Sequence, residues 1–186
     1  GKPPVSLRWV DTNKGFPRGV KVRSRLVARD FKGGDKGRDD LYAATPPIEA
    51  MRLLLSRAVT HTARGFRKLL FVDAKKAHLN PKCEEDVFID LPGEFGCPEG
   101  SCGKLVYWLY GFRPAAAAWE KFYSDILEEA GFSRGIYCGV DFYHPQRDLT
   151  LVVHGDDFTA VGLDEDLSWL QNLMESKFEI QVRGRL

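Results

Sequence analysis

The stretch Leu149–Gly162 reads Leu-Thr-Leu-Val-Val-His-Gly-Asp-Asp-Phe-Thr-Ala-Val-Gly, and the fold can be worked out from it. Two β-prone and almost wholly apolar runs, Leu149–Val153 and Phe158–Val161, flank the tetrad His154-Gly155-Asp156-Asp157. Gly and Asp between two such runs predict a tight β-hairpin. Because both strands are apolar, we expect the hairpin to lie in a core.

The adjacent carboxylates of Asp156 and Asp157 at the hairpin tip are two like charges close together, and this arrangement calls for a physical explanation. Like charges at this separation repel, and partial burial adds to the cost. A divalent cation such as Mg²⁺ or Mn²⁺ would remove the conflict, whereas a solvated Asp-rich turn would explain the same residues without a metal. A third acid, Asp73, also follows an apolar β-like run and favours the metal site.

The composition is that of an ordinary globular protein. The chain has 186 residues, of which 44% are hydrophobic and 28% charged. No apolar run approaches the roughly 18 residues of a membrane span, and the four cysteines are too few and too scattered for a disulfide scaffold. These features predict an intracellular protein with reduced thiols and no membrane span.

The charge is unevenly distributed along the chain. Residues 1–38 hold eleven Lys/Arg against three Asp/Glu, whereas the remainder holds sixteen against twenty-three. Within the basic part, Val20–Arg29 alternates, with Lys21, Arg23, Arg25 and Arg29 on one face. An ordinary charged outer face would give the same pattern, but the absence of acids from it favours binding of a polyanion such as a nucleic-acid backbone.

The rest of the chain predicts a mixed α+β fold. We expect an amphipathic helix after the N-cap Thr45, with its apolar stripe running from Ile48 to Thr62, and an N-cap at Asp164 for a later helix. The other expected elements are strands at Lys68–Val72, Val87–Leu91, Ile136–Tyr143 and Phe178–Val182, and helices at Ala115–Ala130 and Asp164–Lys177. This order is that of a ferredoxin-like split βαβ, an antiparallel sheet with helices on one face. In that plan Asp73 lies beside Asp156 and Asp157.

Five blocks of the sequence then resemble one family, the reverse transcriptase domain of copia-type retrotransposon Pol polyproteins. The blocks are Arg23-Ser24-Arg25-Leu26-Val27-Ala28-Arg29, Phe71-Val72-Asp73-Ala74-Lys75-Lys76-Ala77-His78-Leu79-Asn80, Glu85-Asp86-Val87-Phe88-Ile89 with Pro92-Gly93-Glu94-Phe95, Leu109-Tyr110-Gly111-Phe112-Arg113-Pro114-Ala115-Ala116-Ala117-Ala118-Trp119, and His154-Gly155-Asp156-Asp157. Each block is weakly specific by itself, but the five blocks in this order and spacing are strong evidence for the resemblance.

The resemblance implies a polymerase palm of the ferredoxin-like plan, together with a partial fingers subdomain. The expected domains are an extended basic arm at 1–19, fingers-like elements at 20–68 and 79–108, and palm at 69–78 and 109–186, with the thumb absent.

The resemblance also implies RNA-directed DNA polymerisation, in which Mg²⁺ ions bound by Asp73, Asp156 and Asp157 support transfer from dNTP to a primer 3′-hydroxyl. The residues expected to bind the nucleotide are Arg23, Arg25, Ala74, Ala77 and His78. Those expected to contact template–primer are Gly111, Arg113, His154 and Gly155.

This sequence departs from the family pattern at several of these positions. His78 stands where the family has a bulky aromatic residue, His154-Gly155 where it has Tyr-Val, Arg113-Pro114 where it has Lys-Gln, and Asp30 where it has Gly.

The partners that the resemblance implies are an RNA or DNA template–primer, dNTP, the rest of a Pol polyprotein and other protein subunits. The expected location is a cytoplasmic particle or the nucleus. Two alternatives remain open: a retroelement-derived structural subunit without activity, and a nucleic-acid binder that uses the basic strand without chemistry.

Overall fold

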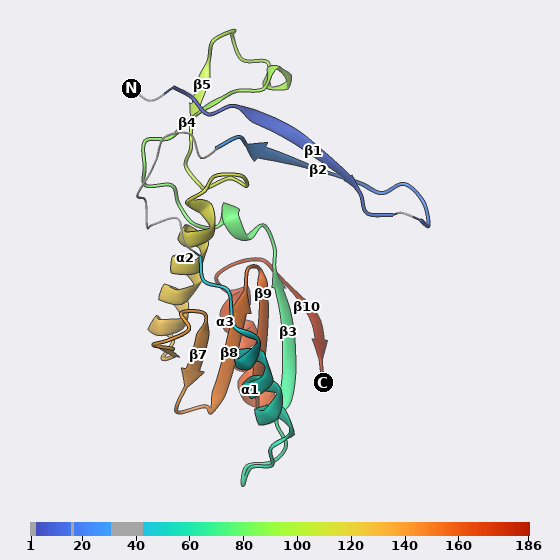
Figure 1. Ribbon diagram of the computed structural model, residues 1–186, viewed down its shortest axis with the longest axis vertical. Coiled ribbons are helices and arrows are strands. Elements are labelled where there is room, and N and C mark those ends of the chain that lie inside the picture. Colours follow the sequence, from blue (N-terminus) through green and yellow to red (C-terminus); the bar gives the residue numbers. More distant parts are fainter. Residues whose placement is uncertain (1–2, 16, 31–42) are drawn as a thin grey trace. The chain divides into compact units, whose positions relative to one another are not determined.

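The computed structural model describes residues 3–15, 17–30 and 43–186 (Figure 1). The predicted Gly/Asp/Lys loop at 31–42 lies outside the described residues. The chain divides into two compact units. We call Gly1–Tyr42 with His78–Ala118 the ribbon unit, and Ala43–Ala77 with Trp119–Leu186 the sheet unit. The assignment of fingers and palm boundaries to the chain stays a prediction.

The ribbon unit is built on a long antiparallel pair, β1 (Leu7–Asn13) and β2 (Val22–Ala28). The described part of this unit also contains a second pair, β4 (Phe88–Asp90) with β5 (Cys102–Lys104), and the short 3-10 turn η3 (Gly93–Phe95). Its buried core consists of Ala28, Cys83, Ile89, Trp108, Phe112 and Ala115.

The sheet unit contains a six-stranded antiparallel sheet in the order β10-β3-β9-β8-β7-β6. The strands are β3 (Lys68–Ala74), β6 (Ser133–Arg134), β7 (Asp141–His144), β8 (Leu149–His154), β9 (Asp157–Gly162) and β10 (Ile180–Arg185). Its helices are α1 (Ile48–Val59), α3 (Asp164–Glu175) and, from Trp119 onward, α2 (Ala115–Glu129). The 3-10 turn η2 (Ala77–Leu79) follows β3 at the boundary between the two units. The predicted central hairpin is confirmed, since β8 and β9 pair from Thr150↔Val161 to His154↔Asp157.

Helices cover both faces of this sheet. The two helices of the predicted split βαβ, α2 and α3, lie on one face as expected, and α1, which we expected among the fingers-like elements, covers the other. Leu151 and Phe158 belong to the large core cluster that includes residues of α2 and α3. The alternate residues Val152 and Val161 face the other way and pack with Leu54 of α1. Figure 1 shows α1 in front of β8 and β9 and α3 behind them. Because strand side chains alternate, one apolar strand buries residues on both faces.

Several element details also differ from the predictions. Neither Thr45 nor Asp164 is an N-cap, since the caps are Pro47 and Leu163 and no side-chain capping bond forms. The N-terminal half of the predicted strand Ile136–Tyr143 is not a strand, and Ile136 is 92% exposed.

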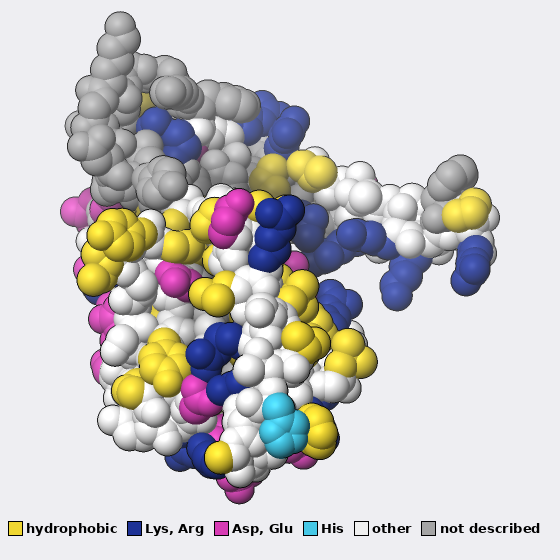
Figure 2. Space-filling view, turned by 60° about the horizontal axis from the view of Figure 1, so that its bottom comes forward, with side chains coloured by type: hydrophobic (Ala, Val, Ile, Leu, Met, Phe, Trp, Pro, Cys, Tyr) yellow, Lys and Arg dark blue, Asp and Glu magenta, His cyan; other side chains and the backbone are white. Residues whose placement is uncertain are grey.

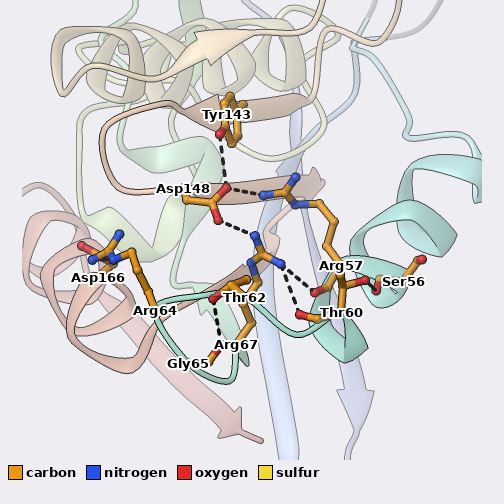
Figure 3. A network of polar contacts seen from close by, with 10 residues as sticks. All are labelled: Ser56, Arg57, Thr60, Thr62, Arg64, Gly65, Arg67, Tyr143, Asp148 and Asp166. Atoms are coloured by element: carbon orange, nitrogen blue, oxygen red, sulfur yellow. Dashed lines mark hydrogen bonds and ion pairs between the residues drawn. The ribbon is translucent and has the colours of Figure 1, made fainter.

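A polar network ties the end of α1 to the turn between β7 and β8 (Figure 3). The carboxylate of Asp148 accepts hydrogen bonds from Arg57, at 2.5 Å, and from Arg67. The hydroxyl of Tyr143 donates to the same carboxylate at 3.2 Å. Burial would raise the pKa of Asp148, but the two arginines outweigh burial and hold that pKa below its usual range.

None of the helices in the described ranges has the length and apolar character needed to cross a lipid bilayer.

Candidate functional site

The sheet unit places two of the predicted acids directly opposite each other. Asp73 near the end of β3 pairs with Asp157 at the start of β9. Asp157 in turn pairs with His154, and Asp73 pairs with Gln181 of β10. Directly opposed residues share a face of the sheet, so all four side chains belong to the face that α1 covers further along the strands.

The turn that carries Asp156 is fixed by its backbone. Gly155 has φ +65° and Asp156 has a negative φ, the pattern of a type II′ hairpin turn, which favours Gly at its first central position. The Gly155 carbonyl accepts a hydrogen bond from the Trp119 indole N–H at 2.8 Å. The Asp156 carbonyl accepts one from the Ala74 N–H at 2.7 Å. The turn is therefore tied to both α2 and β3.

The two opposed carboxylates differ in their electrostatic surroundings. Desolvation by the surrounding protein, then the charges of Asp156 and Asp73, raise the pKa of Asp157. Burial would also raise the pKa of Asp73, but hydrogen bonds from Arg183 and Lys75 outweigh it and lower that pKa. Two cations thus pair with Asp73, whereas at Asp157, an exposed residue, the charge of Arg183 offsets the neighbouring acids only in part.

The donor chemistry of this site fits a divalent cation. Carboxylate oxygens are the ligands preferred by Mg²⁺, and those of Asp73 and Asp157 come from directly opposed positions of paired strands. In the described ranges, however, no three His, Cys, Asp or Glu side chains are gathered closely enough to hold a metal ion. The structure therefore supplies ligands on adjacent strands but not a closed ligand cluster.

A cavity of about 460 Å³ adjoins the acids within the sheet unit. Its walls include Met51, Phe71, Val152, His154, Asp157 and Arg183. The walls therefore combine apolar side chains with a few polar ones, a lining typical of small-molecule and nucleotide sites.

The residues predicted to bind a nucleotide fall in both units. Arg23 and Arg25 lie on one face of the β1–β2 ribbon, and Arg8 lies on the same face of the neighbouring strand. Figure 2 shows Lys and Arg side chains gathered along this ribbon. The predicted strand is confirmed as Val22–Ala28, and the structure adds Arg8 to its cationic face. The expected buried face is not confirmed at its start, since Val20 and Val22 are 85% and 60% exposed.

The other three predicted nucleotide contacts have packing roles in the structure. Ala74 and Ala77 are 2% and 3% exposed and belong to the main core of the sheet unit. The ring of His78 lies 4.9 Å from that of Tyr110 within the ribbon unit. A contact of Ala74 or Ala77 with a nucleotide remains a prediction, and it would have to use the backbone.

Two of the predicted template–primer residues, Gly111 and Arg113, lie next to the end of β2 within the ribbon unit. Gly111 has φ +91°, and a Cβ at this position would lie 2.3 Å from the carbonyl oxygen of Ala28. Arg113 donates its backbone N–H to the Asp30 carboxylate at 3.0 Å, and its guanidinium lies 3.5 Å from the same oxygen. The two departures from the family pattern, Asp30 and Arg113, therefore pair with each other.

Three residues of the site were missed by sequence reasoning: Trp119, Lys75 and Arg183. Lys75 lies two positions after Asp73, so strand alternation could have placed it on the same face. Arg183 and Trp119 are 110 and 36 positions away from their partners, Asp73 and Gly155. No local pattern indicates such contacts.

Comparison with known families gives one match over the entire chain. The family described as Reverse transcriptase (RNA-dependent DNA polymerase) matches residues 1–186.

Proposed function

The chain belongs to the Reverse transcriptase (RNA-dependent DNA polymerase) family, of the kind typical of copia-type retrotransposons, and on this premise we propose that it catalyses RNA-directed DNA synthesis. In this proposal the carboxylates of Asp73, Asp156 and Asp157 hold Mg²⁺, or Mn²⁺ in its place. The bound metal would neutralise phosphate charge and make the primer 3′-hydroxyl a better nucleophile. The observation that carries the proposal is the pairing of Asp73 with Asp157 beside the Asp156 turn.

The chain's own residues would position the reactants around these acids. Arg23 and Arg25 would bind the triphosphate of an incoming dNTP, because guanidinium groups bind phosphate through paired hydrogen bonds. His154 and Gly155, next to the acids, would contact the primer end. His78 would meet the sugar of the nucleotide, and Gly111 and Arg113 would lie against the template–primer.

We further propose that the protein acts as part of a Pol polyprotein in a cytoplasmic particle or the nucleus, as its family does. In this setting the acids of a palm subdomain and the cations of a fingers subdomain would act on one template–primer.

Primer extension tests the proposal. On an RNA template with dNTP and Mg²⁺, the wild-type protein should extend the primer. Asp156→Asn should lower the rate by roughly 10²- to 10³-fold, as for loss of a group that stabilises transition-state charge. Asp125→Asn is the matched control, because Asp125 is an exposed α2 residue paired with Lys121. Equal extension by wild type and Asp156→Asn would refute catalysis at this site.

Nucleic-acid binding without chemistry is the second candidate, favoured by the cationic face of the β1–β2 ribbon. It predicts salt-sensitive RNA binding without extension.

A structural subunit without activity is another candidate function. It is favoured by exposed apolar side chains on α1, Leu53 at 62% and Val59 at 85%. It predicts no extension and stable association with other proteins.

A further inference from the structure

Both oxygens of the Asp73 carboxylate are bound by cations from the chain itself. The Arg183 guanidinium lies 2.8 Å from Oδ1, and the Lys75 ammonium lies 3.0 Å from Oδ2. Lys75 also donates to the Gln181 side chain. The Asp73 carboxylate is only 13% exposed, so these two cations provide most of its polar surroundings.

A β-bulge presents Arg183 to Asp73. In the pairing of β10 with β3, Val182 faces Val72 and Gly184 faces Phe71, so Arg183 is the extra residue in the ladder. Bulges turn a strand locally, re-aim a side chain and are frequent next to active sites. Arg183 also lies on β10, which is an edge strand of the sheet among the residues that the structure describes.

The Arg183 side chain is largely exposed to solvent, although its guanidinium binds Asp73. Its side chain is 53% exposed, in contrast to the 13% of Asp73. Ion pairs with an exposed partner are weak because water solvates the freed charge well. Arg183 can therefore leave Asp73 at small cost, and it still lines the cavity that contains Asp157.

We propose that Arg183 is a resident counter-ion that competes with a divalent cation for the Asp73 carboxylate. The inference rests on the proposed function, which makes Asp73 a metal ligand. Two cations that neutralise one carboxylate weaken each other's binding, and this coupling is reciprocal. Arg183 is thus a positioning residue that keeps Asp73 charged and oriented, and metal binding must displace its guanidinium.

Direct measurement of Mn²⁺ binding to the nucleic-acid-free protein, by electron paramagnetic resonance of the free ion, tests this competition. Arg183→Gln should bind Mn²⁺ roughly twofold to fivefold more tightly than wild type, the range for one exposed charge pair. Arg183→Lys, which keeps the charge, should stay closer to wild type. Arg185→Gln is the matched control, because it removes the same charge from the same strand but Arg185 pairs with Asp164.

The outcomes separate this inference from the proposed function. Mn²⁺ affinity that is unchanged or lower in Arg183→Gln, with wild type still binding, overturns the competition and leaves the polymerase proposal intact. Equal tightening in Arg183→Gln and Arg185→Gln also overturns it, because net charge would then be the cause. Absence of Mn²⁺ binding in every variant, with circular dichroism showing folded protein, overturns both.

Discussion

At the scale of single residues, Asp73 and Asp157 lie opposite each other on neighbouring strands, yet their pKa values move in opposite directions. The difference comes from their neighbours. Asp73 has Arg183 and Lys75, while Asp157 faces Asp73 and Asp156. Two carboxylates on directly opposed positions thus have different cationic neighbours, and the proposed metal site depends on this difference.

Asp157→Asn should make the metal-free protein more stable at pH 7. The folded-state pKa of Asp157 is raised above its unfolded value, so the charged form costs the folded state stability at any pH above the raised pKa. This cost starts to shrink as the pH falls through the raised pKa, and it is gone only below the unfolded-state pKa, where the carboxyl is neutral in both states. Urea unfolding at pH 7 and at acid pH, with chelator, measures the difference.

In that experiment Asp125→Asn is again the control and should give no gain at pH 7. A lower stability of Asp157→Asn than wild type at pH 7 without metal would contradict the assignment of an only partly offset charge to this position.

At the scale of elements, α1 shows how a helix can be correctly predicted and its packing misjudged. The predicted stripe ran from Ile48 to Thr62, but Ile48 is 60% and Val59 85% exposed. Leu54 is fully buried against Val152 and Val161. Because α1 packs mainly on β8 and β9 in the described part of the chain, it needs a narrower apolar stripe than its sequence carries.

Leu54→Ala should lower the free energy of unfolding by about 2–5 kcal/mol, the cost of a cavity beneath a buried leucine. Leu53→Ala changes the adjacent residue, which is 62% exposed, and should stay within about 0.5 kcal/mol of wild type. Chemical denaturation of the three proteins provides the comparison. Equal losses in both variants would show that α1 is held by another face.

At the scale of the whole molecule, the distribution of charge along the sequence has a structural counterpart. The basic N-terminal part forms the β1–β2 ribbon, whose cationic face carries Arg8, Arg23 and Arg25. The three acids lie in the sheet unit. Under the proposed function, the cationic face would bind a polyanion and the acids would act on the bound nucleotide.

Replacing Arg8, Arg23 and Arg25 together by Gln should weaken RNA binding and flatten its salt dependence. Each lost phosphate contact lowers the slope of log K against log[salt] by about 0.7 for single strands, so the triple variant should lose roughly 2. The control removes three exposed lysines of the sheet unit, Lys68, Lys76 and Lys121. Fluorescence anisotropy with labelled RNA gives the slopes, and equal slopes for the two triple variants would refute binding by the ribbon.

The sequence alone determined the features that depend on neighbours along the chain. Strand alternation and a Gly-Asp turn define the β8–β9 hairpin, and the apolar stripe of α2 defines that helix within one residue of its predicted end. The predicted proximity of Asp73 to Asp157 also held, because the split βαβ order makes their strands neighbours.

Only the tertiary structure decided which cations face those acids and which side of the sheet each helix covers. The bulge that presents Arg183 to Asp73 depends on how β10 pairs with β3, and α1 faces the opposite side of the sheet from α2 and α3. Both depend on contacts between residues far apart in the chain. Local periodicity specifies a side chain's face, whereas long-range pairing and packing specify what that face meets.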